Sequence, residues 1–301
     1  MQKHPATSQV ADRYGEVFDR GYARYHGPRR GRRGAVTSLV GYSMKRAMGI
    51  RKSWTAKILP FLLYVAITIP LIIQIGIAAL MPTLEFASYS GYLLGIFLIV
   101  GVFVGTAAPE IICVDRHERT LPLYFSRAIT RGDYVIAKAI AMTLLTMTMT
   151  VISSILLWLG RQLTAAHVGR AMRENIGDLG RVLFVGTMIA LVVSALGLAI
   201  SSCTNRKGVA VAVIMFVFLV LTGVANIGLE VLGDQAWSRY LIALHLPLLF
   251  EGLSSHLFND VNDPVVERVN WSLGAYVSYM ITVIVACLLV LRWRYMPSNE
   301  P

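Results

Sequence analysis

The sequence predicts an all-α integral membrane protein with six transmembrane helices. Hydrophobic residues make up 55% of the 301 residues and charged residues only 15%, which is too apolar a composition for a soluble domain of this size. Polar breaks separate six apolar stretches, and each is close to the ~20 residues that a helix needs to cross ~30 Å of hydrocarbon. The stretches cover residues 58–81, 91–114, 135–159, 182–203, 209–232 and 271–291.

The distribution of basic residues predicts the orientation of these spans. The net charge is +11, and 22 of the 28 Lys and Arg residues fall on the side that carries both termini and the loop after the second span. Lys and Arg accumulate on the cytoplasmic side of membrane proteins. We therefore expect both termini in the cytoplasm, a location in a cell membrane such as the bacterial inner membrane, and contact with lipid, not nucleic acid.

The chain before the first span divides into two parts. Residues 1–35 are basic and lack apolar periodicity, so we expect a mobile cytoplasmic tail and no cleaved secretory signal. Residues 36–57 are predicted to form an amphipathic helix in the membrane surface, because Val36, Val40, Met44 and later apolar residues share one helical face. A hydrated linker is the alternative for this segment. Residues 58–301 then form the six-span domain.

Four glycines at helical spacing mark the second span: Gly91, Gly95, Gly101 and Gly105. Two small residues four positions apart let another helix approach closely in lipid. We expect these glycines to serve helix packing within the subunit, with a subunit interface as the alternative.

The segment between the fifth and sixth spans is long and contains apolar pieces near residues 245–250 and 257–258. These pieces are too short to cross the membrane. Because exposed backbone is not tolerated in lipid, we expect re-entrant or interfacial helices at the outer mouth.

The loop between the second and third spans, residues 115–133, is the most distinctive part of the sequence. Leu121, Tyr124 and Phe125 have the spacing of one helical face, and charged residues flank them. A short helix with an apolar ridge and charged flanks suits docking into a groove of a soluble partner. Thr130 and Asp133 have the spacing of a capping box, which predicts that the third span begins there.

This loop resembles that of the permease subunits of the ABC-2 group of ABC transporters. The resemblance rests on Glu118-Arg119, Thr120-Leu121, the apolar turn that ends at Phe125, Ser126-Arg127, and then Tyr134 and Lys138. It extends to the six-span order and covers most of the chain after residue 35. One departure is that many members have Gly where this chain has Arg119.

The resemblance implies that the loop forms a coupling helix that contacts a separate ATP-binding subunit. The residues expected to dock are Glu118, Arg119, Leu121, Tyr124, Phe125 and Arg127. Two copies of a cytoplasmic ABC ATPase would drive a pair of permeases, as a homodimer or with a similar second permease. Export is the expected direction, by analogy with the family.

The sequence lacks the G-x-x-x-x-G-K-[ST] phosphate-binding loop, so we expect no ATPase activity from this chain. ATP and Mg²⁺ would be bound by the partner subunit, and no metal site or catalytic residue is expected here. An intramembrane enzyme is one alternative, but the middles of the spans offer no convergent ionisable residues. An ion-coupled secondary transporter is the other, for which Asn226 and Glu230 are candidates at an outer pathway.

Overall fold

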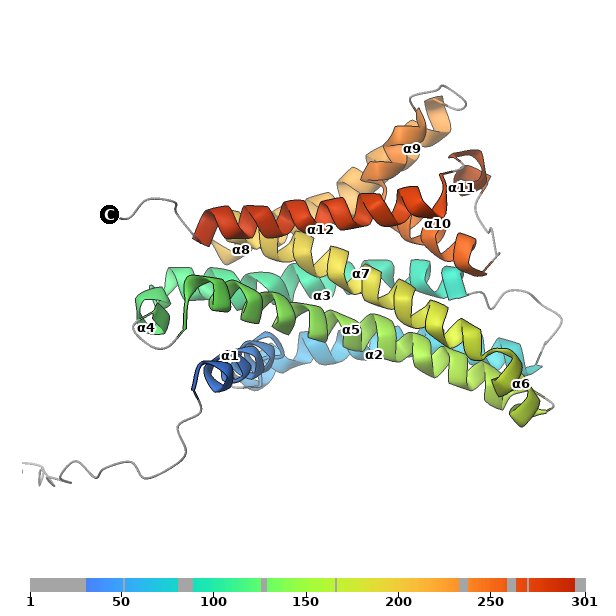
Figure 1. The fold of residues 1–301 in the computed structure, drawn as a ribbon, viewed down its shortest axis with the longest axis horizontal. Helices are drawn as coiled ribbons and strands as arrows, with labels where there is room; N and C mark the ends of the chain where they lie inside the picture. Colours follow the sequence, from blue (N-terminus) through green and yellow to red (C-terminus); the bar gives the residue numbers. More distant parts are fainter. Residues whose placement is uncertain are drawn as a thin grey trace, which may run out of the picture. The chain divides into compact units, whose positions relative to one another are not determined.

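The computed structural model describes residues 31–50, 52–80, 89–125, 129–165, 167–232, 238–258, 264–269 and 271–295. Every regular element in these ranges is helical (Figure 1). Six helices within them are long and apolar enough to cross a membrane, as the sequence predicts. They are α2 (Trp54–Leu80), α3 (Tyr89–His117), α5 (Arg131–Leu163), α7 (Ile176–Cys203), a fifth span over Lys207–Val231, and α12 (Leu273–Tyr295).

The fifth span contains a local change of helix type. It begins as α8 (Lys207–Met215), continues as the π-helical segment η1 (Phe216–Leu221) and ends as α9 (Thr222–Leu232). A π-helical turn holds more residues than an α-helical turn, and such segments are often found at functional sites.

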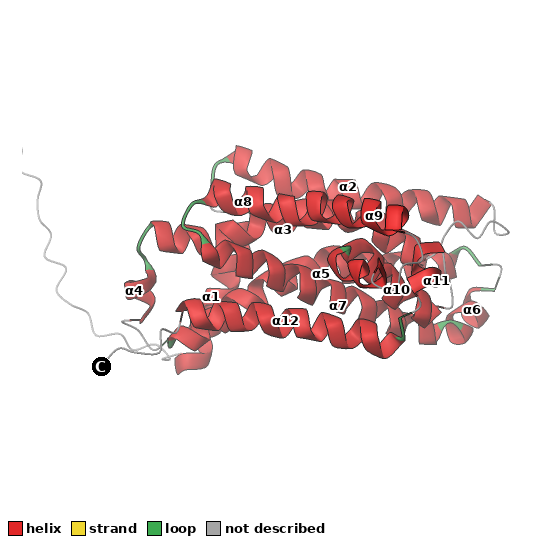
Figure 2. Cartoon of the chain, turned by 90° about the horizontal axis from the view of Figure 1, so that it is seen from above, coloured by secondary structure: helices red, strands yellow, loops and turns green. Residues whose placement is uncertain are grey.

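Helices α3, α5 and α7 form the centre of the bundle, and the other three spans lie around them (Figure 2). In the most apolar 18-residue stretch of α3, 78% of the residues are buried, whereas in that of α12 only 17% are. Apolar side chains such as Phe61 and Ile72 on α2 and Val224 on α9 therefore remain exposed. The peripheral spans can present these faces to lipid or to a second subunit.

Two of the four predicted packing glycines lie where α3 meets the fifth span. A Cβ atom added to Gly101 would lie 3.0 Å from the ring of Phe218, and one added to Gly105 would collide with the methyl group of Met215. Gly95, by contrast, has no such neighbour within 4 Å, and both it and Gly91 are exposed. The close approach thus uses the second half of the glycine series.

Helix α1 (Gly31–Ala47) both begins and ends earlier than the helix predicted over residues 36–57, so its first turns lie in the segment 1–35 that was predicted to be a mobile tail. Gly49 adopts a left-handed backbone with φ of 69°. Its N–H donates to the carbonyl of Arg46 (3.0 Å), and the N–H of Ile50 donates to that of Lys45 (2.9 Å). These two bonds form a Schellman motif, which stops the helix before Ile50 and Trp54.

In the segment before the last span, where re-entrant or interfacial helices are predicted, the described residues form three short helices. They are the 3₁₀-helix η2 (Ser238–Leu244), α10 (Leu246–Phe258) and α11 (Pro264–Val269). The ring Nδ1 of His245 accepts the N–H of Leu248 (3.0 Å), which satisfies a first-turn donor of α10. Residues 246–255 are all buried, and α10 packs on α3, α7 and α12.

Helix α6 (Val168–Glu174) connects α5 to α7 at the end of the bundle opposite α4 (Leu121–Phe125). Trp158, near the end of α5, is buried here and donates its ring N–H to the carbonyl of Asn175 (3.0 Å). A buried ring N–H needs a hydrogen-bond partner, and this bond joins the end of α5 to the residue between α6 and α7.

Candidate functional site

The distinctive loop lies at the end of the bundle that also carries α1, which we call the α4 end (Figure 1). Helix α3 ends there in a second Schellman motif. The N–H of Thr120 donates to the carbonyl of Asp115 (3.0 Å), and that of Arg119 donates to the carbonyl of Arg116 (3.3 Å). Arg119 has a φ of 52° and is the one described residue other than glycine with a positive φ. A glycine in its place, as in many members of the family that the loop resembles, would adopt this backbone without strain.

The five-residue helix α4 packs its apolar ridge against the bundle. Leu121, Tyr124 and Phe125 are partly buried on the core. The ring centres of Tyr124 and Phe125 lie 5.7 and 6.1 Å from that of Tyr134 on α5. The hydroxyl of Thr120 also donates to the carbonyl of Asp115 (3.1 Å), so the loop is fixed to α3 as well.

A different set of loop residues points to solvent. His117, Glu118, Arg119 and Pro122 are exposed. Of the six predicted docking residues, Glu118 and Arg119 are thus accessible, whereas the three apolar ones are half-covered by the chain itself. Arg127 lies outside the described residues.

The capping box predicted at the start of the third span is present. The N–H of Asp133 donates to the hydroxyl of Thr130 (3.2 Å), and the N–H of Thr130 donates to the carboxylate of Asp133 (3.0 Å). The same carboxylate accepts two bonds from Arg32 on α1 (2.7 and 2.8 Å). The cap therefore also ties the first turn of α1 to α5.

Asp115, in the last turn of α3, is the centre of the charged cluster beneath the loop. Its side chain is wholly buried and lies 2.6 Å from Nη1 of Arg46, 2.7 Å from Nζ of Lys138 and 2.9 Å from the hydroxyl of Tyr134. Lys138 is 1% exposed, and its Nζ also lies 5.2 Å from the ring centre of Tyr134. One carboxylate thus joins α1, α3 and α5.

Glu110, about one and a half turns before Asp115, forms a second group of ion pairs. Its carboxylate pairs with Lys52, before α2, and with Lys207, at the start of α8. Nε of Arg46 lies 3.8 Å from the same carboxylate, and its Nη2 lies 3.2 Å from Glu118. Arg46 therefore joins both groups of carboxylates.

These surroundings shift the ionisation of the groups that lie outside the spans. Burial opposes the charge of Arg46, but the carboxylates of Asp115 and Glu118 raise the pKa of this guanidinium above its usual value. Partial burial, together with the charge of Asp115, raises the pKa of Tyr124 to about 12. At physiological pH the loop base therefore contains a cationic Arg46 and a neutral Tyr124.

The candidates for an outer pathway lie outside the packed face of their helix. In α9, Ala225 and Leu229 are buried, whereas Asn226 and Glu230 are exposed. Within one subunit, these two polar side chains point away from the bundle.

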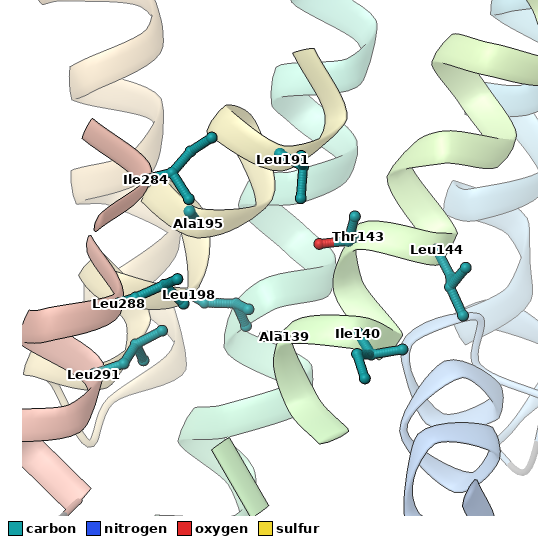
Figure 3. Close-up of a pocket in the computed structure, with 10 residues that line it drawn as sticks. All are labelled: Ala139, Ile140, Thr143, Leu144, Leu191, Ala195, Leu198, Ile284, Leu288 and Leu291. Atoms are coloured by element: carbon teal, nitrogen blue, oxygen red, sulfur yellow. The ribbon is translucent and has the colours of Figure 1, made fainter. Parts of the chain in front are cut away.

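An apolar hollow of about 330 Å³ is formed between α5, α7 and α12 (Figure 3). Leu144, Leu191 and Leu288 are among its lining residues, and Thr143 supplies the one hydroxyl in the lining. None of the lining residues is charged, so no side-chain carboxylate or ammonium group lines this hollow. Among the residues that the structure describes, no group of three or more His, Cys, Asp or Glu side chains is arranged to hold a metal.

The comparison with protein families identifies the chain. Residues 35–295 match the model of the ABC-2 family transporter protein. The chain belongs to the ABC-2 transporter family. The match covers all six spans and the α4 loop, so the protein is a multi-pass membrane permease of this family. No curated protein matches the sequence in a direct search.

The positions of Asp115 and Arg46 at the base of the loop were not predicted from the sequence. A signal was present, because Lys138 lies in an otherwise apolar stretch and a buried ammonium requires a carboxylate partner. Asp115 occupies the corresponding depth at the end of the preceding span. The contact of Arg46 with Asp115 could not be predicted, since the whole of span α2 separates the two residues in the sequence.

Proposed function

We propose that this ABC-2 permease is the membrane subunit of an exporter and that a separate ABC ATPase docks on the exposed side of the α4 loop. The proposal is supported by the way this loop is attached to the helical bundle. Its apolar ridge packs on Tyr134, the hydroxyl of Thr120 donates to the carbonyl of Asp115, and Glu118 and Arg119 remain accessible. A rigid mount with a free outer surface suits a contact that transmits force.

The docking surface is formed by His117, Glu118, Arg119 and Pro122. Tyr124 and Phe125 then act as anchors that fix α4 to α5. A push on α4 would pass into α3 through the carbonyl of Asp115 and into α5 through Tyr134 and Lys138. Binding and hydrolysis of ATP by the partner would thereby bias the spans between two arrangements.

Two permease copies and two ATPase copies form the proposed transporter, with the α4 end in the cytoplasm. Asn226 and Glu230 would line a pathway only where a second permease covers the exposed face of α9. The direction of transport is inferred from analogy with the family.

The test uses variants at exposed positions, because changes at Leu121 or Tyr124 would also disturb packing. Arg119→Asn removes the charge and keeps a residue that tolerates the left-handed backbone. Pro122→Glu places a charge on the outer side of α4. Each variant is reconstituted with the cognate ABC ATPase in liposomes, and ATPase affinity and vanadate-sensitive transport are measured.

We expect Pro122→Glu to weaken ATPase binding by roughly 30-fold, as for residues at the centre of an interface, and Arg119→Asn to weaken it less. Arg292→Asn, at an exposed position in the last turn of α12, is the matched control and should leave binding unchanged. Normal binding and transport by both loop variants would show that the ATPase docks elsewhere.

A further vesicle experiment separates this proposal from the alternatives. The permease alone should not move cargo in vesicles that contain no ATPase. Transport driven by an ion gradient would indicate a secondary transporter, and hydrolysis of a lipid or peptide by the isolated chain would indicate an intramembrane enzyme.

A further inference from the structure

A groove of about 230 Å³ lies beside the charged cluster, outside the loop described above. It is bounded by the turn after α1, the first turns of α2, the part of α3 around Thr106 and Glu110, and the start of α8. Its polar lining includes Arg46, Lys52, Glu110 and Lys207, and its apolar lining includes Leu59 and Pro60.

The charges in this groove are unbalanced in favour of cations. Glu110 is the one carboxylate in the lining, and three cationic side chains surround it. The side chain of Glu110 is 6% exposed, whereas those of Lys52 and Lys207 are 39% and 53% exposed. Each lysine has three N–H donors, so both ammonium groups can donate to a second anion while they remain paired with Glu110.

The groove has a charged part and an apolar part. The apolar part extends along α2 and is formed by Ala56, Leu59 and Pro60, of which Leu59 is 42% exposed. The lysines lie at the ends of spans, since α2 begins at Trp54 and α8 begins at Lys207. Span ends lie at the depth of lipid headgroups, and the next turns of α2 lie at the depth of the acyl chains.

We propose that this groove is a binding site for an anionic phospholipid. Lys52 and Lys207 hold its phosphate, and the face of α2 at Leu59 accommodates the start of its acyl chains. Basic pockets between membrane helices suit such headgroups. A free phosphate ion would satisfy the same lysines, but it would leave the apolar wall without a role.

The test is a lipid titration of the purified, delipidated full-length chain, followed by native mass spectrometry. The ligands are phosphatidylglycerol, zwitterionic phosphatidylcholine and inorganic phosphate. The wild-type protein should bind one phosphatidylglycerol in preference to phosphatidylcholine. Lys52→Gln/Lys207→Gln should weaken phosphatidylglycerol binding by about 25-fold, because each lysine near an anionic headgroup contributes roughly fivefold.

The matched control is Lys45→Gln/Lys57→Gln, which removes the same charge from two nearby lysines outside the groove lining. It should retain wild-type affinity. An equal loss in both double variants would show that the general surface charge attracts the lipid, and the site would be refuted. Displacement of phosphatidylglycerol by inorganic phosphate at matching concentration would refute the lipid assignment, because the acyl contact would then contribute nothing.

Glu110→Gln provides a variant whose effect cannot be confused with loss of folding. Removing this carboxylate frees both lysines for the ligand and raises the net positive charge of the groove. We expect phosphatidylglycerol to bind roughly fivefold more tightly. An unchanged or weaker affinity in a folded Glu110→Gln protein would contradict the assignment of the two lysines.

Discussion

The substitution Asp115→Asn should be among the most destabilising in the described part of the chain. It preserves the shape of the side chain and removes its charge. Lys138, which is 1% exposed and lies 2.7 Å from the carboxylate, would then be a buried ammonium without a charged partner. Breaking a buried ion pair in this way costs about 3–5 kcal/mol. Arg46 would lose less of its charge compensation, because it keeps its ion pair with Glu118 at 3.2 Å.

A double-mutant cycle with Lys138→Met separates the ion pair from other effects. Methionine has a similar length and no charge, so Asp115→Asn/Lys138→Met removes both members of the pair. Replacing a buried pair by apolar groups is often nearly neutral. The double variant should therefore recover more than half of the lost stability, with an interaction free energy of about 2 kcal/mol.

The assay is unfolding of the purified proteins in detergent, by denaturant or temperature, for the wild type, both single variants and the double variant. Asp115→Asn should fold with greatly reduced stability. A loss below about 1 kcal/mol for Asp115→Asn, or a double variant less stable than the sum of the single changes, would refute the role of Asp115 as the charge that compensates Lys138.

Three further changes test the backbone and the cap. Gly49→Ala should destabilise by at least about 1–2 kcal/mol in the same unfolding assay, because φ is positive and the new Cβ would lie 2.6 Å from the carbonyl oxygen of Ala56. Arg119→Gly should instead stabilise the fold by up to about 1 kcal/mol, since glycine relieves the left-handed strain; a loss of stability would mean that the Arg119 side chain contributes more than its backbone costs. Thr130→Ala should cost about 1 kcal/mol through loss of the capping box, with Thr130→Ser close to wild type as the control.

The spans were predictable because length and apolarity alone determine whether a segment can cross a bilayer. The capping box was predictable for a similar reason, since Thr130 and Asp133 interact within one turn. The end of α1 was also signalled, by Gly49 after two basic residues, but extending one apolar face across that glycine concealed it. Each of these features depends on neighbouring residues in the chain.

The packing of α4 could not be obtained from the sequence in the same way. The periodicity of Leu121, Tyr124 and Phe125 shows that they share a face, but it does not show whether that face meets a partner or the chain's own core. Tyr134 covers it, and this depends on how α5 passes behind the loop. The docking surface consequently moves from the apolar ridge to the charged residues beside it.

The electrostatics of α3 explain why α1 belongs to this unit. Asp115 and Glu118 lie at the carboxyl end of α3, where the helix dipole is unfavourable for negative charge. Arg46 offsets both, and it lies at the carboxyl end of α1, where a cation is favoured. Since Arg32 binds Asp133 at the other end of α1, both ends of this helix are tied to the spans that carry α4. A displacement of α4 that moves α3 and α5 would therefore have to carry α1 with it or break the buried Arg46 pair, and the second course leaves Asp115 with less compensation.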